Sequence, residues 1–370
     1  MSENKKVDCW ERFFGLTLNI NPIFNLIGII VISIKRRNRF KKIYSDSINI
    51  YFWLALAVSG IVSIIISYNK PLALLSFFVP FLFVWFYVMG RWYIDNPVRF
   101  LEDVIKGTAI LGLLAIFFYI TKIDLVINDV VLIKGTDNRG FILGIGDNGL
   151  GVLLQVGVIG ALGMLVIETK RKKILENIIY FILSIGGLVI SNSRGAMVGS
   201  VAGIIFLTLV ISWKIIALFG GASIISLLLS SRFMNRVKSI FQYQNSNRFN
   251  IWKGSLKLIR DHLWFGTGPG NFAEVYEKYR VLEEHEHVLT PHNNYLNIIS
   301  GWGIIGGLIF YGWIFFIMIR SWYRGANKYQ IIILAILISF WIHVLFNDLA
   351  FPYVGILLGC LDNKRMKDKV

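Results

Sequence analysis

Three residues of this chain combine a reactive type with a position close to an apolar segment. Arg194 lies in SNSRGAMVG (191–199), a short connection between two apolar stretches. Arg248 lies in a basic segment, and His292 lies in TPHNNYLN (290–297), where a polar loop meets the next apolar stretch. An ionisable residue at or near membrane depth is costly, so we treat each as a functional candidate.

These residue types suit chemistry on a phosphate-bearing substrate. A guanidinium donates two parallel hydrogen bonds and stays charged, which fits a diphosphate. A neutral imidazole can take a proton from a hydroxyl at neutral pH. Each residue also has a plainer interpretation: Arg194 as a snorkelling arginine, Arg248 as an anchor to anionic lipid, and His292 as a cap at a helix entrance. Small residues favour a functional Arg194, because they let a large ligand approach the backbone. They are Ser191, Ser193, Gly195, Ala196 and Gly199.

Membrane-spanning helices must position these residues. The chain has 370 residues, of which 55% are hydrophobic, and a mean hydropathy of +0.63. Apolar runs long enough to cross a hydrocarbon layer of ~30 Å recur along it. We expect an all-α polytopic integral membrane protein, a single membrane domain over 1–370 with about 11–12 transmembrane helices. The predicted segments are 15–34, 48–67, 72–90, 105–121, 149–167, 176–191, 195–212, 214–230, 294–319, 330–346 and 350–361.

The formal net charge of +16 is distributed as the positive-inside rule requires, which argues against nucleic acid as a partner. One set of short loops carries 21 Lys and Arg, and the alternate set carries 5. The bias puts the first set in the cytoplasm and Arg194 on the outer side. The first set is 35–42, 91–106, 168–177, 213–214, 320–328 and 362–370; the second is 68–71, 122–148, 192–194 and 347–349.

The orientation of the N-terminus has two solutions. A first helix that spans the membrane would put the N-terminus outside with Lys5, Lys6 and Arg12, against the charge rule. A re-entrant hairpin over residues 13–34, interrupted by Asn19, Asn21 and Pro22, would leave the N-terminus in the cytoplasm. The charge rule favours the hairpin. No cleavable signal pattern is expected, because no small-residue cleavage site follows the apolar run.

Residues 232–293 form one long loop, which we expect to be an extracytoplasmic subdomain. Its first part, 232–260, has seven Lys or Arg and no acid. Helical spacing there predicts an amphipathic helix on the membrane surface. The helix is interpreted either as an anchor to anionic membrane lipid or as a clamp for a phosphate-bearing lipid. Its predicted apolar face carries Arg248, Trp252, Leu256 and Ile259, and the neighbouring face carries Lys253, Lys257 and Arg260.

Further polar residues are candidates for substrate binding. Arg139 and Asn148 lie with Asp147 in the loop 135–149, where helix capping and binding of sugar hydroxyls are both possible roles. Asn293 adjoins His292, and Lys257 shares the surface helix with Trp252. Aromatic rings at Trp252, Trp264 and Trp302 suit either stacking on sugars or anchoring at the interface.

No metal or other cofactor is expected. The histidines of EEHEH (283–287) are adjacent on a polar loop, which is typical of a solvated loop rather than of a ligand set. The cysteines, Cys9 and Cys360, are too few and too far apart in the chain for a disulfide framework or a zinc site. The segment GTGPG (266–270) follows no strand and contains Pro269, so it predicts a sharp turn and not a nucleotide-binding loop. His343, beside Asn347 and Asp348, is interpreted as a packing residue.

Several of these segments, in this order, resemble the O-antigen ligase and polymerase superfamily. They are GDNGLG (146–151), SNSRGA (191–196), RFNIWKGSLKLIRDHLWFGTGPGNF (248–272) and HNNYL followed by GWGIIGG (292–307). The resemblance covers about 140–320. It implies a multi-span glycosyltransferase of the bacterial cytoplasmic membrane that uses an undecaprenyl-diphosphate-linked glycan and needs no metal. The matching functional positions are Arg194, Arg248 and His292. His262-Leu263-Trp264 stands where the family often has a proline.

The residues and the resemblance together predict an inverting glycosyl transfer on the outer face of the membrane. The partners would be a lipid-linked oligosaccharide donor and a glycan, lipid or protein acceptor; a chain-length regulator is a further candidate. A lipid-linked repeat unit as acceptor would make the chain a polymerase, and a lipid core would make it a ligase. The alternative is a transporter of a lipid-linked glycan or of a small anion. Transporters usually carry inverted repeats, and no internal repeat is evident here.

The charge asymmetry predicts the sidedness of two loops. With Cys9 and Cys360 replaced, a cysteine introduced as Asn245→Cys should react with a membrane-impermeant thiol reagent in intact cells. A cysteine introduced as Asn38→Cys should react only after the cells are opened, because its loop carries the cytoplasmic excess of Lys and Arg. Reversed labelling would put the candidate residues in the cytoplasm.

Overall fold

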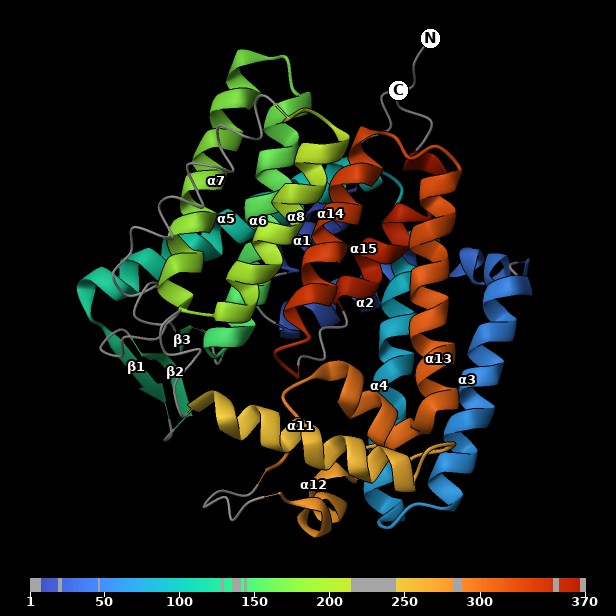
Figure 1. The fold of residues 1–370 in the computed structure, drawn as a ribbon. Coiled ribbons are helices and arrows are strands. Elements are labelled where there is room, and N and C mark those ends of the chain that lie inside the picture. The colour runs from blue at the N-terminus through green and yellow to red at the C-terminus, as the bar shows by residue number, and fades with distance from the viewer. Residues whose placement is uncertain are drawn as a thin grey trace.

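A computed structural model shows a bundle of helices with a small sheet at its edge (Figure 1). It describes residues 8–18, 22–45, 47–127, 130–134, 141–142, 145–213, 244–281, 288–348 and 353–366. Six of the described helices are long and apolar enough to cross a membrane, so the all-α polytopic class is confirmed. These helices are α3 (Ser47–Ile65), α4 (Lys70–Val88, continued by the π-helix η2 over Met89–Tyr93), α5 (Pro97–Thr121), α6 (Asp147–Ile167), α7 (Arg171–Ser191) and α13 (Asn294–Tyr323).

Shorter apolar helices complete the bundle. They are α2 (Pro22–Lys35), α8 (Arg194–Val210), α14 (Lys328–His343) and α15 (Tyr353–Leu361). Helix α1 (Cys9–Thr17) precedes them, and α11 (Gln244–Asp261) and α12 (Phe272–Tyr276) belong to the long loop. The 3₁₀ helices are η1 (Arg37–Ser45), η3 (Glu277–Tyr279) and η4 (Lys364–Met366). The predicted span 214–230 lies outside the described residues.

The loop after α5 contains an antiparallel sheet that the sequence analysis did not predict. Its strands follow one another in the order β1 (Asp124–Ile127), β2 (Val130–Lys134) and β3 (Phe141–Ile142). The register shifts between Leu125 and Val126, which marks a bulge. The sheet leads the chain from the end of α5 to the start of α6.

Helix α6 is the centre of the bundle and positions the residues at its start. Most of its side chains are buried, and it packs against α5, α7, α8 and α14. Glycines make this packing close: a Cβ on Gly151 would lie 2.5 Å from Ser193 Cβ, and one on Gly157 would lie 2.3 Å from Ser184 Oγ. Small residues at a helix contact let the backbones approach, as is usual in membranes.

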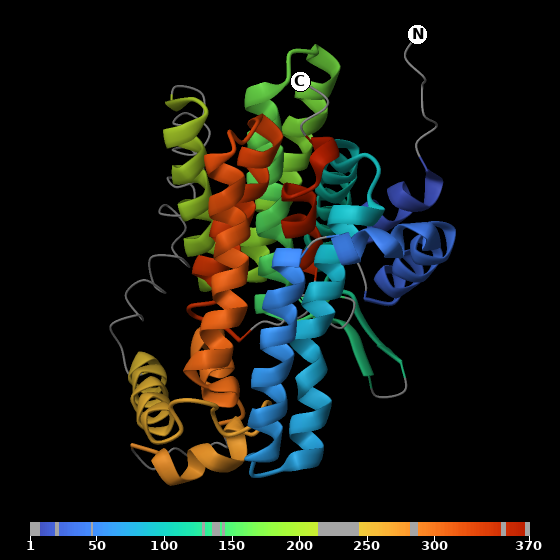
Figure 2. The same ribbon diagram turned by 90° about the vertical axis from the view of Figure 1, so that its right-hand side faces the viewer.

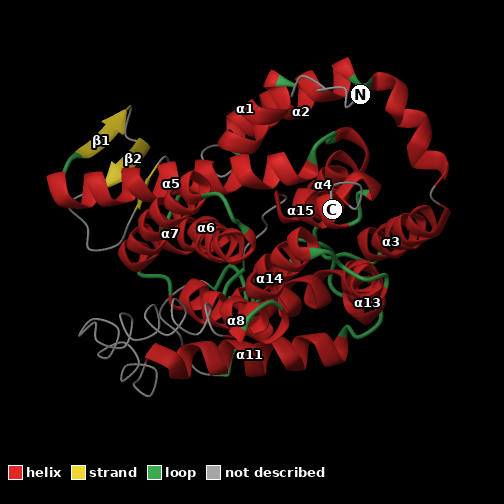
Figure 3. Ribbon diagram, turned by 90° about the horizontal axis from the view of Figure 1, so that it is seen from above, coloured by secondary structure: helices red, strands yellow, loops and turns green. Residues whose placement is uncertain are grey.

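The first apolar segment is a hairpin of two helices. Helices α1 and α2 run along the edge of the bundle, whereas α6 and α14 are seen nearly end-on in the same view (Figure 3). Glu11 of α1 accepts a hydrogen bond from the Asn96 backbone N–H at 2.8 Å and pairs with Arg36 at 3.0 Å. Asp8 also pairs with Arg36, at 3.1 Å. The start of α1 and the end of α2 therefore lie on the same side, as the hairpin alternative requires.

Helix α11 lies across the lower part of the bundle, beside the lower end of α13 and below the red C-terminal helices (Figures 1 and 2). The GTGPG turn that follows it enters a kink of α13 at Gly303, which has φ 70° and ψ 178°. Thr267 N–H donates to the Ser300 carbonyl at 2.8 Å, and Ile304 N–H donates to the Leu263 carbonyl at 2.7 Å. A Cβ on Gly303 would lie 2.2 Å from the Trp264 carbonyl oxygen. The turn therefore attaches α11 to the bundle.

The described part of the long loop has a small hydrophobic core of its own. It comprises Ile251, Leu258, Ile259, Phe272, Val275, Tyr276 and Val288. Spacing of three and four residues along α11 puts its members of this core on one face. Phe249 and Leu256 are exposed on α11. Leu256 was predicted on the apolar face, but the face that packs is the one that carries Ile251 and Leu258.

Candidate functional site

The starts of α6 and α8 are held together at the end of the bundle that α11 covers. Ser193 is the N-cap of α8, and its hydroxyl donates to the Asn148 side-chain oxygen at 3.0 Å. Asn148 is the second residue of α6 and is half-buried. Arg194 is the first residue of α8, also half-buried. Close packing beneath Arg194 fixes the helix start, since a Cβ on Gly195 would lie 2.5 Å from the His343 ring.

Arg248 of α11 reaches the same region. Its Nη1 donates to the Phe346 carbonyl at 3.1 Å. Burial lowers the pKa of Arg248, the nearby charge of Arg194 lowers it further, and Asp147 opposes the shift. An arginine stays protonated at neutral pH despite such shifts. Two guanidinium groups on separate elements are thus close enough to repel each other, and an anion placed between them would relieve that repulsion.

His292 lies beside this pair on the loop that enters α13. Its backbone is left-handed, with φ 51°, and its side chain is exposed. Desolvation by the surrounding protein and the charge of Arg248 both lower the pKa of His292. The imidazole is therefore neutral at pH 7, which a proton acceptor requires.

Both neighbours of His292 are fixed by hydrogen bonds. The indole N–H of Trp252 donates to the Pro291 carbonyl at 3.0 Å, which ties α11 to the loop. Asn293 is the N-cap of α13, and its side-chain oxygen accepts from the Tyr295 and Leu296 N–H groups at 3.0 and 3.1 Å. The side-chain oxygen of Asn293 is thus engaged by the start of α13.

Asp348 belongs to the same surroundings, although it was not among the candidate residues predicted from the sequence. Its Oδ1 accepts from the Asn297 amide at 2.9 Å, and the Thr290 side chain also hydrogen-bonds to its carboxylate. Burial raises the pKa of Asp348 to about 6, against those two hydrogen bonds. A carboxylate in the apolar stretch 344–358 was the available signal, because such residues are costly near the membrane. Through these hydrogen bonds, Asp348 ties the loop that carries His292 to the chain after α14.

The other residues predicted from the sequence differ in whether they reach this site. Lys257 is exposed on α11, half a turn away from Arg248 in helical angle, and it does not join the group. Trp302 is 3% exposed and stacks on Phe77 with centroids 5.6 Å apart, so its predicted availability for sugars is wrong. Trp264 is 63% exposed. Arg139 and the histidine run 283–287 lie outside the described residues.

The arrangement can bind a multiply charged anion beside a neutral base. No group of three potential metal ligands occurs among the residues the structure describes. The positive charge at the site comes from Arg194 and Arg248, and Asp147 offsets part of it. A diphosphate matches this charge, and a hydroxyl brought up to His292 would meet a proton acceptor.

Part of the chain matches a known protein family. Residues 179–311, a little over a third of the chain, match the model of the family described as O-antigen ligase. The matched region runs from within α7 to within α13 and contains Arg194, Arg248 and His292. Asn148 and Asp348 lie outside it. No curated protein matches the chain. The match confirms the resemblance to the O-antigen ligase and polymerase superfamily.

The contacts of Asp348 predict how its substitution changes the loop. Asp348→Ala should leave Asn297 and Thr290 unpaired, at a cost of ~1–3 kcal/mol for a buried group. Amide hydrogen exchange over residues 288–297 should then be at least ~10-fold faster. Asp348→Asn retains an accepting oxygen and should exchange nearly as slowly as the unmodified chain. Unchanged exchange in the alanine variant would contradict this role.

Proposed function

We propose that this chain, which carries the O-antigen ligase region at 179–311, transfers or polymerises a glycan linked to a lipid diphosphate. The observation that carries the proposal is the convergence of three elements: α8 brings Arg194 close enough to Arg248 of α11 for their charges to interact, and the loop before α13 places His292 beside Arg248. The site would face the outer side of the bacterial cytoplasmic membrane. The donor would be an undecaprenyl-diphosphate glycan.

The reaction divides between the arginines and the histidine. His292 takes the proton from an acceptor hydroxyl while the hydroxyl oxygen attacks the anomeric carbon. The bond from that carbon to the diphosphate oxygen breaks, and the lipid diphosphate leaves with the electron pair. Arg194 and Arg248 stabilise the charge that develops on it. Attack from the face opposite the leaving group inverts the configuration.

The arginines supply the positive charge that a divalent ion supplies in many diphosphate-dependent transferases. Each guanidinium offers fixed donors that match phosphate oxygens, and a partly buried site strengthens these interactions. We therefore propose a metal-independent reaction. Arg248 reaches the site from α11 and Arg194 from the start of α8, so a diphosphate would bind between the two.

Helix α11 suits the approach of a lipid-linked donor. Its exposed surface combines Phe249 and Leu256 with Lys253, Lys257 and Arg260. Apolar side chains beside cations are typical of helices that lie in the interface of an anionic membrane. A donor that moves in the plane of the membrane would meet this helix first. The acceptor is a second lipid-linked unit in a polymerase, and a lipid core or a protein in a ligase.

A transporter of the lipid-linked glycan is the competing function. It would need the arginine pair but no proton acceptor. The neutral, exposed imidazole next to Arg248 favours the enzyme, because a histidine kept neutral adds nothing to anion binding. Formation of a glycosidic bond by the purified chain decides between the two.

Replacement of His292 should remove catalysis and leave donor binding. Asn is the suitable substitute, because it tolerates the left-handed backbone of this position and provides no base. His292→Asn should lower kcat by ~10²–10⁴-fold with little change in the donor Kd. The assay uses purified protein in nanodiscs with a synthetic undecaprenyl-diphosphate oligosaccharide. His262→Asn, at an exposed histidine just beyond α11, is the matched control and should be unaffected. Near-normal transfer by His292→Asn would remove the histidine from the mechanism.

Arg248 should also influence the pH dependence of the reaction. Because Arg248 lowers the pKa of His292, Arg248→Ala should raise that pKa toward its usual value. The acidic limb of the kcat–pH profile lies below pH 6.5 in the unmodified chain and should move to higher pH in the variant. The donor Kd should also rise by ~10-fold or more, as expected for a lost charged hydrogen bond. Arg260→Ala, with a side chain 81% exposed on the same helix, is the control. If the acidic limb did not move in Arg248→Ala, Arg248 would not control the pKa of His292.

A further inference from the structure

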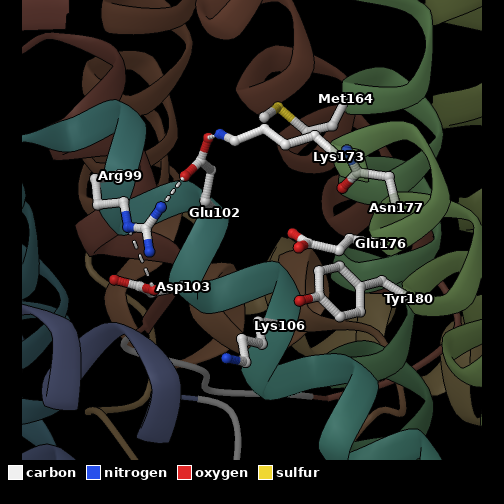
Figure 4. A pocket seen from close by; sticks show the side chains of 9 residues that line it. All are labelled: Arg99, Glu102, Asp103, Lys106, Met164, Lys173, Glu176, Asn177 and Tyr180. Atoms are coloured by element: carbon white, nitrogen blue, oxygen red, sulfur yellow. Dashed lines mark hydrogen bonds and ion pairs between the residues drawn. The ribbon is translucent and has the colours of Figure 1, made fainter. Parts of the chain in front are cut away.

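A charged cavity of about 200 Å³ lies between α5, α6 and α7, away from the candidate site (Figure 4). It is lined by residues near the starts of α5 and α7, whereas Arg194 follows the end of α7. At a rise of ~1.5 Å per residue, residues 177 and 191 of α7 are about 20 Å apart along the axis. The volume exceeds the ~10–15 Å³ that a single water needs. The cavity is a separate feature with room for a molecular group.

Four charged side chains of the lining satisfy one another. Arg99 pairs with Glu102 at 2.8 Å and with Asp103 at 3.8 Å, and Lys173 pairs with Glu102 at 2.6 Å. These contacts join the first turns of α5 and α7. They make one wall of the cavity, and their charges are already balanced.

The remaining polar residues of the lining have no such partners. Lys106 on α5 and Glu176 on α7 form no ion pair within the described chain. Asn177 is 8% exposed, and its carboxamide has no hydrogen bond to any residue that the structure describes. Glu176 and Tyr180 project from α7 toward the space beside α5 (Figure 4). A half-buried carboxylate without a partner is costly, so a ligand that pairs with Glu176 would be favoured.

Exposed apolar side chains continue from the cavity along both helices. They are Ile110, Leu113 and Phe117 on α5, and Leu175, Ile179 and Ile182 on α7. The spacing from Lys106 to Ile110, Leu113 and Phe117 puts that lysine on the same face of α5. Exposed apolar faces of membrane-spanning helices meet acyl chains. An occupant with a polar head and apolar chains therefore fits both the cavity and its surroundings.

We propose that this cavity binds the headgroup of a zwitterionic phospholipid that carries a phosphate and a primary ammonium group. Lys106 and the Asn177 amide donate to the phosphate, and the ammonium donates to Glu176. The lining holds three cations and three carboxylates, so its formal charge is zero. An anionic headgroup would instead be recognised by an excess of Lys and Arg. Lys170, Arg171 and Lys172 are exposed near the start of α7 but do not line the cavity.

The first test compares lipids on the unmodified, full-length chain. The purified protein is equilibrated with equimolar phosphatidylethanolamine, phosphatidylcholine and phosphatidylglycerol, and bound lipid is counted by native mass spectrometry. Phosphatidylethanolamine should be retained ~10-fold over phosphatidylcholine, whose quaternary ammonium has no N–H to donate to Glu176. Equal retention of these two lipids, or a preference for phosphatidylglycerol, would overturn the proposal.

The second test places the preference at the cavity. Glu176→Gln keeps the size of the side chain and removes its charge, so the preference for phosphatidylethanolamine should fall to about one-fold. Lys172→Gln, beside the cavity but outside its lining, should keep the full preference. If the glutamine variant at 176 retained the preference, or Lys172→Gln lost it, the lipid would be held elsewhere and the proposal would fail. If Glu176→Gln does not fold, the comparison on the unmodified chain decides alone.

Discussion

The repulsion between Arg194 and Arg248 is the constraint on which the candidate site depends. Both side chains are half-buried, and the charge of Arg194 disfavours that of Arg248. Flexible elements would separate the two arginines, so rigid ones must hold them. The Ser193 hydroxyl fixes the start of α8 on Asn148, and the Phe346 carbonyl holds the Arg248 guanidinium. An anion that relieves this repulsion would meet a prepared site, which would lower the reorganisation that binding requires.

The rigidity originates in backbone contacts that small residues permit. The GTGPG turn enters the kink of α13 at Gly303, where any side chain would meet the Trp264 carbonyl. That contact sets the angle at which α11 leaves the bundle and carries Arg248 to the site. The glycines that give this segment a superficial likeness to a phosphate loop therefore act on protein backbone. Its interpretation as a sharp turn is consistent with these contacts.

The sequence predicted what depends on composition and local pattern. Long apolar runs located the spanning helices. The sequence did not predict the features that depend on contacts between distant parts of the chain. The sheet at 124–142 has no strict alternation to reveal it, and Trp302 is buried only because Phe77 of α4 stacks on it. Asp348 joined the site because the chain after α14 returns to Thr290 and Asn297, which no local spacing shows.

The plain alternative for His292, a cap at the entrance of α13, does not fit the contacts. Asn293 is the residue that caps the helix, with two backbone N–H groups on its side-chain oxygen. His292 instead takes a left-handed backbone, φ 51°, which costs free energy for a residue other than glycine. The conformation persists because Trp252 holds one neighbour and the helix start holds the other. Its consequence is an accessible imidazole beside Arg248, whose pKa is lowered by desolvation and also by that charge. A cap needs neither feature, and a proton acceptor needs both.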